Sequence, residues 1–289
     1  MSQNNNNNFR QNQQNAVMDW VKSVPLITKM FFFPTFIFGA MATYGMVTPY
    51  SLILYWPGIW SFQIWRLVTP FLFVGKFSFN FAMHLYMIYS YFPRYEANPY
   101  NTGAGGSVAD VLWMVILSMG LLLIAGYFLE LMLLGDPILF VIIYLWSRKD
   151  SESIVSIFGF KFKAAYVPWV YLALNILMGS SIVPPLSGIV VGHTYFYFVE
   201  VFPVIYGYQL IKTPKFCRDA VPLLLRIMPT QIADNNSANQ QFQPRNQAPT
   251  QPTGGNNFGG TPNLRNRAPA ANDRPATYNW GQGRALGSQ

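Results

Sequence analysis

The sequence has few charged residues and almost no cysteine or histidine. Only 10% of its 289 residues are charged, whereas a typical soluble domain has about 25%. Hydrophobic residues make up 52% of the chain and the mean hydropathy is +0.22, although residues 230–289 are almost wholly polar. The apolar residues are therefore concentrated before Thr230, and this composition excludes an ordinary soluble enzyme.

Scarcity of cysteine and histidine excludes several kinds of site. With Cys217 alone the chain forms no internal disulfide and no cysteine-based zinc or iron–sulfur site. His84 and His193 are too few for a histidine-rich metal centre, so no metal or cofactor is expected. The net charge is +8, but no stretch gathers five or six Lys and Arg, which argues against nucleic-acid binding.

Composition divides the chain into three parts. Residues 1–16 are rich in Asn and Gln and lack the apolar core of a signal peptide, so we expect a disordered N-terminal tail. Residues 17–229 hold the apolar segments and form the expected membrane domain. Residues 230–289 are rich in Asn, Gln, Pro, Gly and Ala and are expected to be a disordered cytosolic tail.

Six apolar segments are candidate membrane spans, so the expected fold class is an all-α membrane protein with six transmembrane helices. A span needs about 20 largely apolar residues, and the second, fourth and fifth segments are shorter. Short spans thin the bilayer or lie sheltered inside a bundle. The candidates are Met30–Val47, Phe77–Phe92, Val108–Leu129, Leu131–Trp146, Ala165–Met178 and Val183–Phe202.

Residues 48–75 connect the first two candidate spans and are rich in Trp, Tyr and Pro. Pro49, Pro57 and Pro70 prevent one continuous helix there. Because Trp and Tyr favour the headgroup level of a bilayer, we expect a structured loop with short helices that lies in one leaflet.

The distribution of Lys and Arg predicts the orientation. If both termini face the cytosol, 17 of the 19 Lys and Arg lie on the cytosolic side and only Arg66 and Lys76 lie outside. The excess agrees with the positive-inside rule.

Several polar residues fall within or beside the candidate spans. Asn80 and His84 are four residues apart and share one side of a helix, and His193 and Glu200, seven apart, are expected to share a face. Neither pair includes a Ser or Cys nucleophile, so we interpret these groups as satisfying one another inside the bundle rather than as catalytic.

Two motifs resemble the rhomboid-type fold. Trp65-Arg66 ends the aromatic segment, and Gly188 and Gly192 form a G-x-x-x-G pattern in the last span. Such a pattern allows two helices to approach closely. A six-span chain that combines both motifs is similar to rhomboids.

Within that superfamily the sequence resembles the derlin family from about Val24 to Pro203. The resemblance rests on short stretches in several spans. They are Phe77-Ser78-Phe79-Asn80-Phe81, Met83-His84-Leu85-Tyr86, Tyr144-Leu145-Trp146-Ser147-Arg148-Lys149, Pro168-Trp169-Val170, Gly188-Ile189-Val190-Val191-Gly192-His193, Tyr195-Phe196 and Val201-Phe202-Pro203.

The resemblance also indicates whether the chain carries the catalytic residues of active rhomboids. Active rhomboids carry a Ser in G-x-S-G upstream of Y-x-W-x-R, and registration against Tyr144 to Arg148 places Gly135 at the Ser position. Their His precedes the first Gly of G-x-x-x-G by three residues, where this chain has Pro185. The resemblance therefore implies a pseudoprotease without the Ser/His dyad.

The chain ends in a segment that resembles the SHP box, by which derlins recruit the hexameric valosin-containing AAA+ ATPase. An extended peptide could bury the Trp and Leu in pockets while the glycines permit close backbone approach. The residues of the motif are Trp280, Gly281, Gly283, Leu286 and Gly287.

The derlin resemblance implies a role in endoplasmic-reticulum-associated degradation, with misfolded proteins and a membrane ubiquitin-ligase complex as partners. The expected mechanism combines a thinned bilayer around the aromatic loop with a polar cleft for unfolded chain. The residues assigned to this cleft are Asn80, His84, Asn175, His193 and Glu200. An active intramembrane protease and a small-molecule transporter remain as alternatives.

Overall fold

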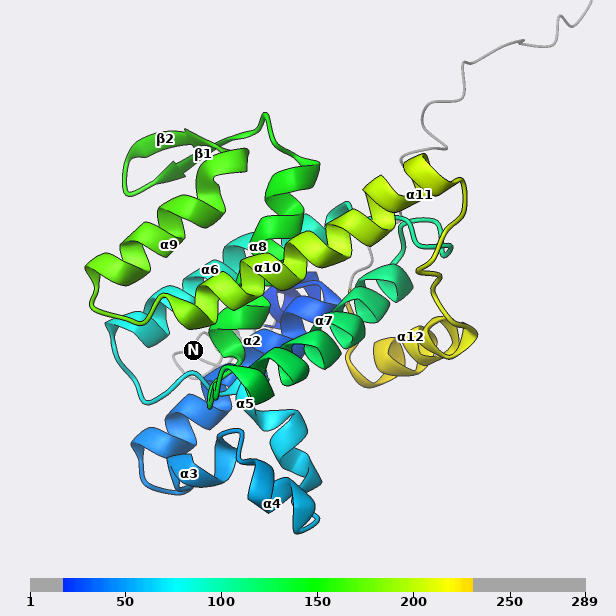
Figure 1. Ribbon diagram of the computed structural model, residues 1–289. Helices are drawn as coiled ribbons and strands as arrows, with labels where there is room; N and C mark the ends of the chain where they lie inside the picture. The colour runs from blue at the N-terminus through cyan, green and yellow to red at the C-terminus, as the bar shows by residue number, and fades with distance from the viewer. Residues whose placement is uncertain (1–17, 231–289) are drawn as a thin grey trace, which may run out of the picture. The chain divides into compact units, whose positions relative to one another are not determined.

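The computed structural model describes residues 18–230, and these residues are mostly helical (Figure 1). The longer helices are α2 (Leu26–Thr43), α6 (Phe79–Ala97), α7 (Val108–Phe128), α8 (Gly135–Lys149), α9 (Val167–Leu177) and α10 (Val183–Phe196). The short helical elements are α3 (Pro49–Leu52), α4 (Trp56–Trp60), η1 (Ile64–Leu67), α5 (Thr69–Leu72), η2 (Ala164–Tyr166), the π-turn η3 (Tyr197–Val201) and α11 (Phe202–Tyr206). Strands β1 (Ile154–Ile157) and β2 (Phe160–Lys163) form a hairpin, and α12 (Lys215–Ile227) ends the described part.

Each of the six expected apolar segments falls on one of the longer helices. Within residues 18–230, three continuous helices are long and apolar enough to cross a membrane: Leu26–Thr43, Val108–Phe128 and Val183–Tyr206, the last of which combines α10, η3 and α11. The helix Ala164–Leu177 is apolar but shorter. The chain is therefore built as expected for a multi-pass membrane protein.

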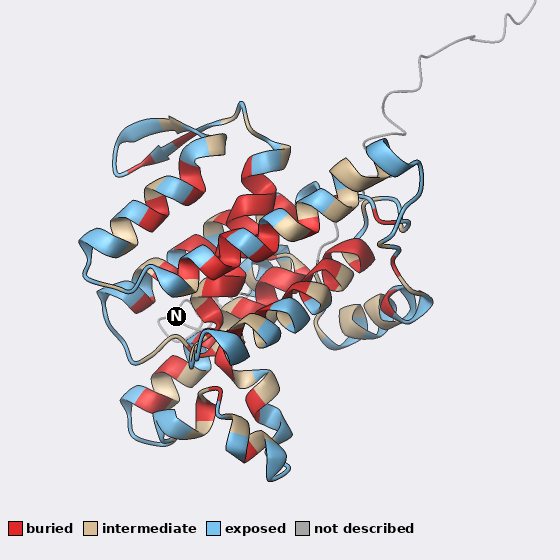
Figure 2. Ribbon diagram, viewed as in Figure 1, coloured by how far each residue is buried: buried red, intermediate tan, exposed pale blue. Residues whose placement is uncertain are grey.

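Helix α8 lies at the centre of the fold (Figures 1 and 2). Of its 15 residues, 12 are buried, including an unbroken run from Pro137 to Ser147. A helix that is apolar around its whole circumference is stable only when other helices cover every side. Helices α6, α7, α9 and α10 all contact it, so α8 is the element on which the others pack.

Two glycines allow α10 to lie directly against α8. A Cβ at Gly188 would overlap the backbone carbonyl oxygen of Pro137, and a Cβ at Gly192 would lie 3.1 Å from the Tyr144 ring. The G-x-x-x-G pattern therefore serves close packing within the chain.

Glu96 caps α2 from a different helix. The residue before α2 is Pro25, which has no side-chain donor or acceptor to cap the helix. The buried carboxylate of Glu96, in the last turn of α6, instead accepts hydrogen bonds from the backbone amides of Ile27 (3.0 Å) and Thr28 (3.1 Å) and from the Thr28 hydroxyl (3.1 Å). A negative group also interacts favourably with the positive end of a helix dipole, so this carboxylate fixes the start of α2 against the end of α6.

Asp110 performs a similar task at the start of α7. Its buried carboxylate accepts hydrogen bonds from the hydroxyls of Thr102 and Thr213 and from the backbone amides of Ala104 and Gly106. Thr102 precedes α7 and Thr213 precedes α12, so one carboxylate joins two loops that are distant in sequence.

Helix boundaries differ from the sequence predictions at several ends. Helix α6 continues five residues past the expected end at Phe92, because the polar side chain of Glu96 finds partners on α2. Helix α8 starts at Gly135 rather than Leu131, because the chain reverses at Glu130, whose φ is 53°. Helix α2 starts and ends four residues earlier than expected.

The sequence analysis missed three elements. The β1–β2 hairpin turns through Phe158 and Gly159, which both have positive φ, as a two-residue type I′ turn requires. The π-turn η3 interrupts the last long helix, and α12 lies in a region that carried no expected helix.

The cap on α2 makes a stability prediction for Glu96→Gln. The substitution replaces the carboxylate by a group with one acceptor oxygen and leaves a buried donor at the start of α2 unsatisfied, which costs about 1–3 kcal/mol. The purified full chain in detergent should lose thermal stability, as measured by the temperature at which its monodisperse fraction falls by half.

Glu152→Gln is the matched control, because Glu152 pairs with Lys163 on the exposed hairpin and exposed ion pairs contribute little. Equal melting temperatures for Glu96→Gln and the unmodified chain would show that the cap does not contribute to stability.

Candidate functional site

A cavity of about 380 Å³ lies among α6, α8 and α9. Its walls are mostly apolar, with polar groups toward the start of α6 and α8. The lining residues are Val74, Phe79, Asn80, Met83, His84, Met87, Asp136, Leu139, Phe140, Phe158, Tyr171, Leu174, Asn175, Met178 and Ser180.

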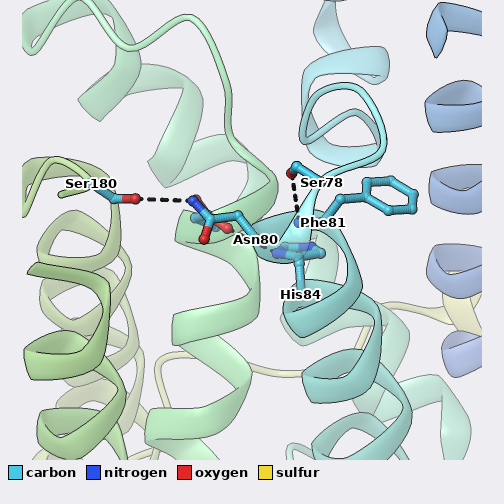
Figure 3. Close-up of polar contacts among 6 residues, drawn as sticks. Ser78, Asn80, Phe81, His84 and Ser180 are labelled. Atoms are coloured by element: carbon cyan, nitrogen blue, oxygen red, sulfur yellow. Dashed lines mark hydrogen bonds and ion pairs between the residues drawn. The ribbon is translucent and has the colours of Figure 1, made fainter. Parts of the chain in front are cut away.

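Two polar contacts connect the elements around this cavity. The Nδ1 atom of His84 on α6 lies 2.8 Å from Oδ1 of Asp136 in the first turn of α8. The Asn80 amide donates to the hydroxyl of Ser180, which follows α9, at 3.3 Å. Figure 3 shows Asn80 reaching from α6 toward Ser180, with His84 one turn further along the helix. The cavity thus has a polar end held by residues from three separate segments.

One polar atom in the cavity wall is unsatisfied. The Oδ1 atom of Asn175 on α9 is buried and has no hydrogen-bond partner within residues 18–230. A buried acceptor without a partner is costly, so a rotation of the Asn175 amide that brings Oδ1 to a donor in the cavity would be favourable.

The apolar walls contain three methionines and one strained aromatic residue. Met83, Met87 and Met178 have flexible side chains that adapt to differently shaped occupants. Phe158 lies at the tip of the β hairpin with a φ of 51° and also lines the cavity. A non-glycine residue at positive φ is uncommon, and here it brings an aromatic ring to the cavity.

The structure separates the five residues assigned to one polar cleft. Asn80, His84 and Asn175 line the cavity, whereas His193 and Glu200 do not. The Nδ1 atom of His193 lies 2.7 Å from the Tyr144 hydroxyl, and Glu200 is exposed. The π-turn η3 holds Glu200 and departs from the α-helical period on which the expectation of a shared face for His193 and Glu200 rests.

Sequence reasoning also missed members of this site. The sequence analysis assigned no role to Asp136, Ser180 or Phe158. A carboxylate at the start of an apolar span is rare and marks a functional position, so Asp136 carried a usable signal. Ser180 and Phe158 carried none, because only the fold brings them to α6 and α9.

Arg66 of the Trp-Arg motif is buried and organises the aromatic loop. Its Nη1 donates to the carbonyl oxygens of Tyr50 (2.7 Å) and Ile53 (3.0 Å), and its Nε donates to Oε1 of Gln63 (2.6 Å). The guanidinium also lies over the rings of Tyr50 and Tyr55, 5.3 and 5.7 Å from their centroids. Arg66 therefore ties α3, α4 and η1 together.

Trp65 has the opposite environment. Its side chain is 51% exposed and belongs to a group of exposed apolar residues on the loop. The other members are Trp60, Phe62 and Ile64. An exposed apolar patch of this kind marks a surface that contacts lipid or another protein, so the motif combines one structural residue with one surface residue.

The positions that correspond to the rhomboid dyad hold no reactive side chain. Gly135 is the first residue of α8, and a Cβ there would meet the Val74 side chain at 2.7 Å. Pro185 is buried in the first turn of α10. Among residues 18–230, no Ser hydroxyl hydrogen-bonds to His84 or His193, whose rings contact Asp136 and Tyr144 instead.

The tail motif of Trp280, Gly281, Gly283, Leu286 and Gly287 lies outside the described residues. The structure therefore describes residues of the membrane domain and does not test the tail motif.

Comparison with known proteins places the chain in a family. The model of the Der1-like family matches residues 24–215. Derlin-1.2 of Zea mays is 35% identical over 207 residues, which cover 70% of this chain and 84% of that protein. Derlin-1 of Homo sapiens is 31% identical over 278 residues, which cover 94% of this chain and 98% of that protein. Derlin-2.2 of Arabidopsis thaliana is 32% identical over 217 residues.

A family match over most of the membrane domain, together with relatives above 30% identity along 84–98% of their length, agrees with the long apolar helices of the fold. The chain therefore belongs to the Der1-like family of multi-pass membrane proteins.

Proposed function

We propose that the chain is a non-catalytic derlin of the endoplasmic reticulum membrane that assists the transfer of misfolded proteins from the lumen to the cytosol. Family membership implies a role in endoplasmic-reticulum-associated degradation. The observation that carries the mechanism is the cavity among α6, α8 and α9, which combines adaptable apolar walls with an unsatisfied polar atom on Asn175.

Such a cavity suits an unfolded segment of a client protein. Apolar client side chains contact the methionines, and a backbone amide of the client donates to Asn175. Moving backbone polar groups through hydrocarbon costs several kcal/mol for each unsatisfied group, and the polar end formed by Asn80, His84 and Asp136 lowers that cost.

The aromatic loop contributes by thinning the bilayer. The exposed side chains of Trp60, Phe62 and Trp65 anchor at the headgroup level, and Arg66 holds the loop in shape. In this arrangement six helices cross the membrane in a rhomboid-like bundle, with both termini in the cytosol.

The C-terminal tail recruits the ATPase that supplies the pulling force. Residues Trp280 to Gly287 dock on the valosin-containing AAA+ ATPase, and a membrane ubiquitin ligase modifies the emerging client. The match to Derlin-1 of Homo sapiens covers 94% of the chain and so includes most of residues 230–289. This coverage supports the proposal that the tails of the two proteins have the same function.

Trp65→Ala should slow the clearance of a misfolded client without lowering the amount of the protein, because the exposed side chain makes the membrane contact but supports little packing. Trp169→Ala is the control, since Trp169 on α9 is equally exposed at 51%. Cycloheximide-chase half-lives of the client provide the measurement. Arg66→Ala removes three hydrogen bonds and should also reduce the amount of folded protein. Normal clearance with Trp65→Ala contradicts the role of the loop.

A photo-reactive amino acid at Asn175 should crosslink to a misfolded client in microsomes, because this side chain faces the cavity. Position 124 is the control, since Ile124 is 57% exposed on α7 and does not line the cavity. Immunoblots of the client quantify the adducts. Equal adduct yields at the two positions would remove the cavity from the mechanism.

A peptide of residues 278–289 should capture the AAA+ ATPase from cytosol, and a peptide with Trp280→Ala and Leu286→Ala should not, because both pocket-filling side chains are lost. The bound ATPase is identified by immunoblot and mass spectrometry. Equal capture by both peptides, or none, counts against docking at this motif and leaves the membrane mechanism to be judged by the two tests above.

A further inference from the structure

Helix α12 follows the last long helix and packs on α7 with one face only. Cys217 on this face is fully buried, and burial raises the pKa of its thiol above the usual range. Ala220, Val221 and Leu224 lie half-buried on the same face against the core. The spacing of three and four residues is that of one side of a helix, so this face attaches α12 to the fold.

A second face of α12 is apolar but largely exposed. Phe216, Leu223 and Ile227 are 57%, 60% and 65% exposed. Their spacings of seven and four residues align them in a strip along the helix. Leaving large apolar side chains in water is unfavourable by about 25 cal/mol for each Å², so the strip points to an apolar partner.

Basic side chains border this strip. Lys215 and Arg226 are exposed and lie on the side of the helix next to the strip, and Lys212 is exposed just before the helix. Asp219 is the one acidic residue in the sequence of α12. Arg218 is engaged within the chain, because its Nη2 donates to the Gly103 carbonyl oxygen at 2.7 Å. The border of the strip therefore carries a net positive charge that is exposed at the surface.

The position of α12 brings this strip close to the bilayer. The helix begins nine residues after Tyr206, where the apolar helix Val183–Tyr206 ends. The ring of Phe216 also packs edge-on against Trp113 in the second turn of α7, with centroids 5.9 Å apart. Figure 1 shows α12 beside the first turns of α7, and α7 is itself long and apolar enough to span the membrane.

We propose that α12 is an interfacial helix that lies on the membrane surface and binds anionic phospholipid. Phe216, Leu223 and Ile227 enter the boundary between headgroups and acyl chains, while Lys215 and Arg226 contact lipid phosphates. An exposed apolar strip, bordering cations and a tether to a spanning helix are the features that favour such helices. No protein partner is needed to cover the strip.

The test places an environment-sensitive fluorophore on α12 in the full chain, reconstituted in vesicles. In a Cys217→Ser background, Leu223→Cys carries the fluorophore on the strip and Asp219→Cys carries it on the polar side. Vesicles contain phosphatidylcholine alone or with phosphatidylserine, each with and without spin-labelled lipid. The fluorophore at position 223 should emit at shorter wavelength and be quenched by the spin label more strongly than at position 219.

Charge dependence gives the second arm. Phosphatidylserine should increase quenching at position 223, and Lys215→Gln with Arg226→Gln should abolish the increase, because each cation near an anionic surface changes partitioning by about fivefold. A solvent-like spectrum at position 223 in every vesicle overturns the proposal. A blue-shifted spectrum without lipid quenching also overturns it, because a protein segment then covers the strip.

Hydrogen exchange on the unmodified chain keeps the proposal testable if Cys217→Ser fails to fold. In lipid nanodiscs, the amides of residues 215–227 should exchange several-fold more slowly with phosphatidylserine than with phosphatidylcholine alone. Identical exchange in the two lipids would contradict anionic lipid binding. The amides of β1 and β2 serve as the internal reference.

Discussion

The close approach of α10 to α8 is the constraint on which the rest of the fold depends. Gly188 has no side chain where the carbonyl oxygen of Pro137 lies, so the two backbones meet directly. This contact covers one side of α8, and α6, α7 and α9 cover the others. At one end of the assembly Glu96 and Asp110 join loops and helix starts through buried carboxylates. At the other end the helices separate enough to leave the cavity beside Asp136.

The sequence predicted the spans that carry local signals and misplaced those that depend on tertiary contacts. Helix α7 was placed within one residue, because its whole length is a long apolar run in which Asp110 is the one charged residue. The start of α8 was misplaced because residues 131–134 are apolar but not helical. The amide of Leu131 donates to the carbonyl oxygen of Gly126, and the amide of Leu134 donates to that of Pro70. The end of α6 was missed because a charged residue such as Glu96 reads as the end of a span unless its partners on α2 are known. Helix α12 was recognisable from its apolar spacing, but its residues follow the last candidate span and were assigned no helix.

The candidate site was predictable only in part, for a similar reason. Helical spacing alone grouped Asn80 with His84, and both line the cavity. The same rule grouped His193 with Glu200, but neither residue lines the cavity, and periodicity does not reveal the π-turn that holds Glu200. Arg66 was identified as part of a motif, but its three hydrogen bonds to the loop come from residues up to 16 positions away, and no spacing rule indicates them.

The hydrogen bond from Lys29 to the carbonyl oxygen of Pro229, 2.8 Å long, has a mechanical consequence. Tension applied to the chain beyond Thr230 first meets this bond to α2 and the narrow packed face of α12. Segments with few buried contacts open first, so α12 yields while α8 stays folded. Its 13 residues span about 20 Å as a helix and about 45 Å when extended. Unfolding of α12 under tension therefore lengthens this segment by about 25 Å. The packing around α8 does not bear the initial force.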